Sequence, residues 1–340
     1  MRSASSGNSG LGCTGYDAPV NSLERRLLRR SIRIHQNLYR SFGLSHQHVR
    51  KCGSLVVAWT PEELKKLPGV LAENTEAGDT YACLLSRDEL KALEPTLSSD
   101  ALGAVLLPNE AVVEPWLVPQ GYAEAGRRAG VQYLTGEEVV NTKRKHSLGV
   151  DTITHTDTLF NGKYWEINTT PCSDSSVGRS KPGELLTPCP HSTKTSDHNN
   201  NIILSKSNPC LITHKAKIVI NCAGLFGNEI ESMRLSQHEH RSKNIERSGS
   251  MSDGVTEEIP FHVVPRKGQF VVFNPCSMDG QVPKQLLTPQ YIIEPVATEF
   301  TKGVIVWTTV YGNVIVGPTA VNQQNKRDRS TDSETIEHLI

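Results

Sequence analysis

The sequence lacks an excess of charge of either sign, because 36 lysines and arginines are matched by 36 aspartates and glutamates. This balance argues against a nucleic-acid-binding or a polybasic membrane-binding protein, since both need surplus positive charge. No apolar run approaches the roughly 18 residues that suggest a transmembrane helix. The first residues also lack the apolar stretch of a secretory signal. We therefore expect an intracellular protein, cytoplasmic or mitochondrial, without a transmembrane segment and without nucleic acid as a partner.

The eight cysteines form no CxxC pair, and their spacing shows neither a zinc site nor a disulfide framework. We interpret them as reduced thiols. Hydrophobic residues make up 37% of the chain and charged residues 21%, so a core can be buried and wholesale disorder is not expected. At roughly 150 residues per domain, 340 residues predict about two domains.

Two short motifs resemble functional sites, and we reject both. Gly10–Gly15 matches GxGxxG letter for letter, but neither a strand before it nor a helix directly after it is predicted, and dinucleotide binding requires both. His46 and His48 could bind a metal from a strand, but no third ligand is indicated nearby. We expect surface or hydrogen-bonded histidines and no metal.

Helix signals are strongest after Asn21, which we predict to cap a helix that Gly43 ends. Its leucines and isoleucines are expected on one face and its arginines mainly on the other. We interpret the arginine face as solvent-exposed, and a phosphate-binding site is the less favoured alternative. These arginines are Arg25, Arg26, Arg29, Arg30 and Arg33. Capping residues also predict helices after Thr60 and Ser86, and another helix is predicted from Pro115 to about Arg128.

Strand-like segments are separated by polar stretches. We predict buried strands over 53–59 and 103–107, a pair of short strands within 131–140, and a strand over 216–221 followed by a turn and a helix. Five further strands are predicted after residue 260, at 261–264, 268–273, 291–294, 303–307 and 313–316, in an antiparallel sheet. The stretch 142–213, with one plausible strand at 164–167, reads as a polar insertion, and 237–258 as a second polar loop. We expect about 171–210 and 237–257 to be disordered or loosely attached.

Six segments, taken in order, resemble the FAD-dependent oxidoreductases of the D-amino-acid oxidase superfamily, in the branch of glycerol-3-phosphate and L-2-hydroxyglutarate dehydrogenases. The segments are Ser5-Ser-Gly-Asn-Ser-Gly10, Arg50-Lys-Cys-Gly-Ser-Leu-Val-Val-Ala58, Gly103-Ala-Val-Leu-Leu-Pro-Asn-Glu-Ala-Val-Val-Glu-Pro-Trp116, Val219-Ile-Asn-Cys-Ala-Gly224, Pro265-Arg-Lys-Gly-Gln-Phe270 and Tyr311-Gly-Asn-Val-Ile-Val-Gly-Pro-Thr-Ala320. The resemblance runs from about residue 4 to 328, apart from the polar stretches.

The resemblance implies an α/β plus α+β protein, with a Rossmann-like FAD-binding domain and an antiparallel-sheet substrate domain. We expect the partial FAD-binding domain over 1–258, with interleaved substrate-domain strands, the substrate domain over 259–320, and a polar tail over 321–340. Cofactor contacts are implied for a small-residue segment near the flavin, a strand that meets the adenine, and a turn that lies against the cofactor. The residues concerned are Ser5, Ser6, Gly7, Asn8, Ser9, Gly10, Val139, Cys222, Ala223 and Gly224.

The implied chemistry is hydride transfer from a CH–OH substrate, of the glycerol phosphate or 2-hydroxy acid class, to FAD. A small anionic hydroxy-substrate needs fixed positive charge, for which Arg266 and Lys267 are the candidates, with a solvent-facing basic turn as the equal alternative. His262 is the candidate base, although a histidine in a strand is more often structural. The alternatives are a catalytically inactive fragment or incomplete isoform of such an enzyme, and a binding module that uses the β domain alone.

The sequence departs from the family pattern at both ends and at two site positions. The first βαβ unit with its GxGxxG helix is expected before Ser5, and further strands and a glycine-rich stretch are expected after Ala320. The resemblance therefore predicts a chain truncated at both ends, which binds FAD weakly or not at all. Cys13 stands where relatives tend to carry histidine in an HxG-type motif, and Tyr311 stands in a turn that is often His-Gly-Asn.

Overall fold

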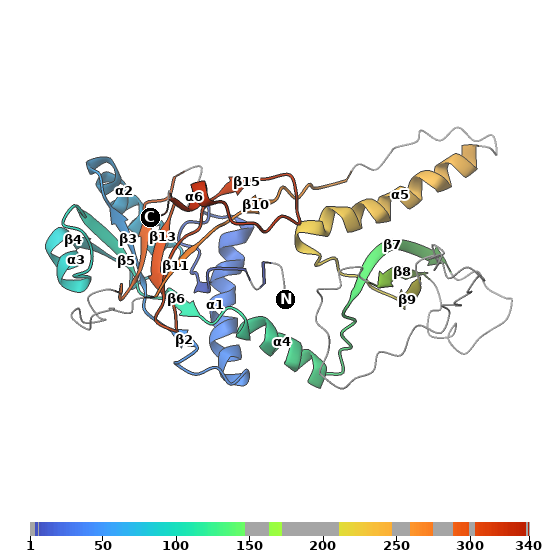
Figure 1. Ribbon diagram of the computed structural model, residues 1–340, viewed down its shortest axis with the longest axis horizontal. Helices are drawn as coiled ribbons and strands as arrows, with labels where there is room; N and C mark the ends of the chain where they lie inside the picture. Colours follow the sequence, from blue (N-terminus) through green and yellow to red (C-terminus); the bar gives the residue numbers. More distant parts are fainter. Residues whose placement is uncertain are drawn as a thin grey trace, which may run out of the picture. The chain divides into compact units, whose positions relative to one another are not determined.

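The computed structural model describes residues 4–5, 7–146, 163–171, 211–246, 259–274, 288–298, 303–337 and 339. The chain divides into two compact units (Figure 1). The first unit combines Met1–Gln132 with Arg266–Ile340, and the second is Tyr133–Pro265. This division differs from the boundary expected near 258, because the strands after residue 265 return to a sheet that the first hundred residues begin.

A seven-stranded mixed sheet is the centre of the first unit, with the order β11-β14-β13-β12-β3-β5-β4 (Figure 1). The only parallel pair in this sheet joins β12 to β3, with Ile293 opposite Leu55. All its other neighbours are antiparallel. The strands are β3 (Ser54–Ala58), β4 (Cys83–Ser86), β5 (Gly103–Leu107), β11 (Val271–Phe273), β12 (Ile292–Pro295), β13 (Ile305–Thr308) and β14 (Val314–Gly317).

Both faces of β3 are covered, which explains why all five of its residues are buried. Successive side chains of a strand point to opposite faces. Accordingly, Leu55 packs with Leu90 of α3 (Arg87–Leu93), whereas Val56 packs with Leu67 of α2 (Pro61–Glu76). The strands predicted at 53–59 and 103–107 are confirmed, and the α/β architecture that they imply is a three-layer arrangement in this part of the unit.

The capping predictions hold for two helices. Thr60 and Glu63 form a capping box at the start of α2, and Ser86 and Glu89 form one at the start of α3. The helix predicted after Pro115 is α4 (Leu117–Arg128). A short helix, α6 (Ser333–Glu337), lies within the stretch expected to be a polar tail.

The long helix α1 (Leu23–Ser41) corrects two expectations. Its N-cap is Ser22, whose Oγ accepts a hydrogen bond from the Arg25 N–H, whereas Asn21 precedes the cap with a left-handed φ of 64°. Arg25 lies on the buried side of the helix, not on a solvated arginine face. The end predicted at Gly43 is confirmed, since the helix stops at Ser41 and Gly43 adopts a φ of 76°.

Two small sheets complete the first unit. One has the order β1-β6-β2, with β1 (Leu11–Gly12), β6 (Ala111–Val113) and β2 (Val49–Arg50), and the other pairs β10 (Arg266–Lys267) with β15 (Val321–Asn322). The GxGxxG match at Gly10–Gly15 therefore contains a short antiparallel strand, not a turn between a strand and a helix. Its rejection as a dinucleotide fingerprint is confirmed.

The second unit holds a three-stranded antiparallel sheet, β7-β8-β9, beside helix α5 (Figure 1). The bounds are β7 (Glu137–His146), β8 (Lys163–Pro171), β9 (Ile212–Ala216), the 3₁₀ turn η2 (Gly224–Phe226) and α5 (Gly227–Glu246). The strand expected at 164–167 is confirmed as part of β8, and the helix expected after the 216–224 segment is α5. Because α5 continues to Glu246, the polar loop predicted from residue 237 is wrong over 237–246.

Three strand predictions fail in and beside the second unit. Residues 131–140 contain the start of one long strand instead of two short ones. The run 218–221 forms no strand, and Ile218 and Ile220 are 78% and 80% exposed, because no described strand pairs with them. The segment 261–264 also forms no strand. The other four segments predicted after 260 correspond to β11, β12, β13 and β14.

Two further expectations concern regions that the structure describes only in part. The predicted disorder over 172–210 and 247–257 lies outside the described residues. Within the described ranges, no helix is long and apolar enough to cross a membrane.

Candidate cofactor-binding site

A cavity of about 1160 Å³ lies within the first unit. Its walls come from the N-terminal segment with β1, from one side of α1, from the small sheet β1-β6-β2, and from the start of α4. Small-molecule pockets usually measure about 300–1000 Å³. The cavity is therefore large enough for an extended cofactor.

The N-terminal segment is held in a compact loop by Asn8. Its amide Nδ2 donates hydrogen bonds to the carbonyls of Ala4 and Ser5, at 3.1 and 3.3 Å, and its Oδ1 accepts one from the Gly10 N–H at 2.9 Å. Gly10 has a φ of 68°, and a Cβ there would lie 2.6 Å from the Val113 carbonyl oxygen. Only glycine fits this position, because both the left-handed backbone and the close approach to β6 exclude a side chain.

The charged residues among the described lining are all basic. Arg40, Arg50 and Lys51 line the cavity together with His35 and His46, and no described lining residue is acidic. Arg50 is fixed by hydrogen bonds from Nη1 to the Gln290 carbonyl and from Nη2 to the Thr308 carbonyl, at 2.8 and 2.6 Å. This charge pattern favours an anionic ligand.

An aromatic cluster forms the side of the cavity between α1 and α4. The Tyr122 hydroxyl lies 3.1 Å from His35 Nε2, and the His35 ring stacks on Tyr39 with 5.6 Å between centroids. Phe42 packs edge-on against Tyr122 and fills the space beside Gly121, where a Cβ would lie 2.4 Å from the phenyl ring. Partial burial lowers the pKa of His35, so the imidazole is predominantly neutral near pH 7.

Two buried glutamates support the cavity wall from the core side. Glu110 accepts hydrogen bonds from the Thr14 N–H and hydroxyl at 2.6 and 2.5 Å, and the Tyr16 hydroxyl donates to Glu294 at 2.7 Å. Burial, together with the nearby Glu294 carboxylate, raises the pKa of Glu110 to about 8. These contacts tie the segment that follows β1 to the loop before β6 and to the central strand β12.

The predicted cofactor residues fall in both units. In the first unit, the predicted residues Ser5, Asn8 and Gly10 line the cavity. Cys13, which stands where relatives tend to carry histidine, also lines it and has an exposed thiol. Gly7 and Ser9 belong to the same loop without lining the cavity, and Ser6 lies outside the described residues. The structure thus brings three of the six residues of the small-residue segment to one cavity.

The remaining predicted cofactor residues belong to the second unit. Val139 is a half-buried residue of β7, next to the irregularity in the β7–β8 register. Cys222, Ala223 and Gly224 are exposed in the turn that leads into α5, and Gly224 has a φ of 56°. Their contact with a cofactor stays a prediction.

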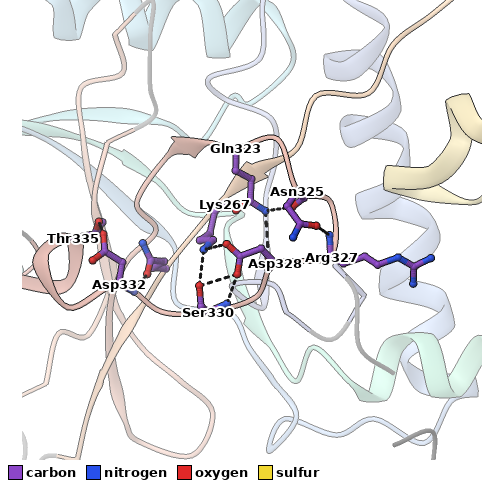
Figure 2. Close-up of polar contacts among 9 residues, drawn as sticks. Lys267, Gln323, Asn325, Arg327, Asp328, Ser330, Asp332 and Thr335 are labelled. Carbon is purple, nitrogen blue, oxygen red and sulfur yellow. Dashed lines mark hydrogen bonds and ion pairs between the residues drawn. The ribbon is translucent and has the colours of Figure 1, made fainter. Parts of the chain in front are cut away.

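The three candidate substrate residues, Arg266, Lys267 and His262, do not line the cavity. Lys267 is engaged in an ion pair, because its Nζ lies 2.8 Å from Asp328 Oδ2 and 3.2 Å from Ser330 Oγ (Figure 2). This ion pair strongly lowers the pKa of Asp328. Arg266 is exposed on β10, and His262 is exposed in the second unit and lies outside any strand. The structure therefore gives Lys267 a structural partner and leaves the roles of Arg266 and His262 as predictions.

Sequence reasoning missed three residues of the cavity wall. The sequence places Arg50 only within a family segment, and it places His35 and Tyr122 on helices without indicating a role. Because 87 residues separate His35 from Tyr122, no local sequence pattern reveals that they meet. Of the rejected pair His46 and His48, the second is hydrogen-bonded as expected, since its Nδ1 accepts from the Ser45 N–H at 3.2 Å.

The whole chain matches a known protein family, described as FAD dependent oxidoreductase, over residues 2–340. The chain belongs to this family. A glycerol 3-phosphate dehydrogenase of Caloramator mitchellensis is 22% identical over 333 residues, which are 98% of this chain and 51% of that protein. A D-amino acid dehydrogenase of Helicobacter pylori is 34% identical over 76 residues, which are 22% of this chain and 18% of that protein.

Solved structures show the same fold. An L-α-glycerophosphate oxidase from Mycoplasma pneumoniae, with FAD bound, superposes with a TM-score of 0.66 at 19% identity, over 98% of this chain and 66% of that one. A glycine oxidase from Geobacillus kaustophilus gives 0.61 at 16% identity, over 99% of this chain and 66% of that one. The chain thus spans about half of the glycerol 3-phosphate dehydrogenase and about two thirds of these oxidases.

The residues of the cavity fit an FAD molecule. Ser5, Asn8 and Gly10 line the cavity without bulky side chains, which permits close approach of a flat ring system. The basic lining suits the doubly charged pyrophosphate of the cofactor. The cavity volume exceeds what a small substrate alone would need.

Proposed function

We propose that the chain acts as an FAD-dependent oxidoreductase that removes hydride from a CH–OH group. One observation carries this proposal: Ser5, Asn8 and Gly10, from the segment that the family resemblance assigns to the flavin, line a large cavity whose described charged residues are all basic. When bound, FAD supplies the acceptor for the hydride. Membership of the family supports the same cofactor.

The roles of the cavity residues follow from their chemistry. The loop organised by Asn8 would hold the cofactor through backbone groups, because a position such as Gly10 leaves no side chain in the way. Arg40 and Lys51, both exposed among the lining residues, would attract the phosphates of the cofactor or an anionic substrate. In the second unit, we keep Val139 and Cys222–Gly224 as predicted contacts of FAD.

The substrate that we propose is a small anionic hydroxy compound, either a glycerol phosphate or a 2-hydroxy acid. Two of the similar proteins act, by their names, on glycerol phosphate. Arg266, which is exposed, remains the candidate for binding the substrate anion through its guanidinium group.

The experiment is anaerobic reduction of the FAD-loaded protein, followed by flavin absorbance. We expect glycerol 3-phosphate or a 2-hydroxy acid to bleach the flavin, and glycine to leave it oxidised. Bleaching by glycine alone would instead assign the chain to amine oxidation. A flavin that every substrate leaves oxidised would contradict the proposed activity.

One observation favours a second candidate, a chain that binds FAD without turning over. Cys13, an exposed thiol of the cavity wall, stands where the family resemblance expects histidine. The variant Cys13→His separates the two candidates, because it introduces a histidine that can accept a proton near neutral pH. If only Cys13→His reduces FAD with substrate, the inactive form is the correct description of this chain.

A further inference from the structure

The outward side of helix α1 carries an apolar stripe. Leu23, Leu27 and Ile34 are 60%, 55% and 42% exposed. At 3.6 residues per turn they fall within about 40° of one another around the helix and extend over about 16 Å of its axis. The opposite side of the helix carries buried Arg25 and half-buried Leu28 and Ile32, and the last two also line the cavity. The stripe is therefore an additional apolar face of the helix, which the described residues of the first unit leave exposed.

Arginines follow one border of this stripe. Arg26, Arg30 and Arg33 are exposed, and they form no ion pair among the described residues. The helix contains a single acidic residue, Glu24, in its first turn. The outward face thus combines exposed leucine with unpaired positive charge, and neither the cavity nor the proposed oxidation uses it.

We propose that this face of α1 docks on the surface of an anionic lipid bilayer. A helix with leucines on one arc and arginines beside it lies in the plane of the membrane, with the apolar side chains at the headgroup boundary and the guanidinium groups on lipid phosphates. The same face of a second copy is disfavoured as the occupant, because it carries the same positive charge and offers no anionic groups to the arginines.

The zero net charge of the whole chain does not oppose this interaction. Electrostatic attraction to a membrane surface decays over about 10 Å at an ionic strength near 0.1 M, so the charge close to the contact decides binding. The proposal also does not depend on the proposed oxidation, since none of the residues that form the stripe and its arginine border lines the cavity.

The test is vesicle flotation of the full chain, with vesicles of equimolar phosphatidylserine and phosphatidylcholine compared with phosphatidylcholine alone. We expect binding to the mixed vesicles, little binding to phosphatidylcholine, and weaker binding as salt is added. Because this comparison uses the unaltered protein, an absence of binding to the mixed vesicles overturns the proposal.

Variants locate the contact. Each arginine near an anionic surface contributes about fivefold to binding, so Arg26→Gln with Arg30→Gln should weaken binding about 25-fold. Leu27→Ser should weaken it at least about tenfold. The matched controls lie on α2, where Lys65→Gln with Lys66→Gln removes the same charge and Leu64→Ser removes a leucine that is 40% exposed.

The controls should bind the mixed vesicles like the unaltered chain, and thermal unfolding verifies that every variant is folded. Equal losses in the α1 and α2 variants would overturn the assignment of the contact to α1. Self-association in sedimentation experiments that Leu27→Ser abolishes would assign the face to a second copy and would also overturn the proposal.

Discussion

At the scale of single residues, the buried pair Glu110 and Glu294 links the candidate site to the core. Both side chains are at least 95% buried, and each accepts a hydrogen bond from the segment that follows β1. Burial disfavours the ionised form of Glu110, and the charge of the Glu294 carboxylate adds to this effect. Glu110 therefore holds its proton at pH values where an exposed glutamate has lost it.

This raised pKa predicts how stability depends on pH. The unfolded chain releases the Glu110 proton near pH 4.5, whereas the folded chain keeps it until about pH 8. The contribution of Glu110 to the free energy of unfolding should therefore be greatest below pH 4.5. It should fall by roughly 2–4 kcal/mol between pH 5 and 8. Glu110→Gln mimics the protonated form and should remove this decline.

Urea unfolding of both proteins across this pH range measures the difference. Because all titrating groups outside the pair are shared, subtracting the two curves isolates the contribution of Glu110 together with its effect on Glu294. Parallel curves for the unaltered chain and Glu110→Gln would contradict the account of the buried pair.

Gly10 provides a second prediction at the residue scale. Gly10→Ala places a Cβ 2.6 Å from the Val113 carbonyl oxygen on a left-handed backbone, so we expect a loss of at least about 2 kcal/mol of stability and weaker FAD binding. The control is Gly43→Ala, which has a similar φ of 76° but no atom within 4 Å of the added Cβ, and should lose only about 1 kcal/mol. Thermal unfolding ranks the two, and equal losses would show that the contact with β6 is unimportant.

At the scale of elements, α1 is anchored by a single arginine. Arg25 donates from Nη1 to the Ala18 carbonyl at 3.0 Å and from Nη2 to Asn74 Oδ1 at 3.2 Å, and it lies 3.7 Å from Glu73. Arg26, one position on, is exposed. Neighbouring arginines of one helix thus have different environments.

We predict that Arg25→Ala destabilises the protein by about 2–4 kcal/mol, because it leaves buried acceptors without donors. Arg26→Ala should change stability by less than about 0.5 kcal/mol. Urea unfolding compares the two variants. A similar small effect for both would mean that the buried arginine does not hold α1 in place.

Local signals predicted the elements whose causes are local. The capping boxes of α2 and α3 and the glycine after α1 are short-range chemistry that the sequence displays directly. Arg25 could not be assigned from periodicity, since its burial depends on Asn74 from another helix. The run 218–220 looks like a buried strand by composition, yet a strand needs a hydrogen-bonded neighbour, which composition does not reveal.

At the scale of the whole molecule, one long-range pairing sets the division into units. β12 lies parallel to β3 although more than two hundred residues separate them in the chain, and this pairing joins the C-terminal strands to the N-terminal sheet. A boundary near 258 follows from reading composition along the chain, which carries no information about such pairing. The cavity was equally hidden, because its walls combine segments from 5 to 122.

The division predicts that the first unit folds by itself. Residues 1–132 joined by a short flexible linker to 266–340 contain all seven strands of the large sheet and the complete cavity lining. We expect a cooperative unfolding transition and mixed α/β circular dichroism from this shortened chain. A chain without a cooperative transition would show that the second unit is required for folding.

The most direct test of the central claim, that FAD occupies the cavity of the first unit, is hydrogen exchange of the full chain with and without saturating FAD. Saturation makes the comparison independent of how tightly the cofactor binds. The account predicts slower exchange in the loop 4–10, in β1 and on the cavity side of α1. Slower exchange elsewhere with these segments unchanged, or no change at any FAD concentration, would contradict it.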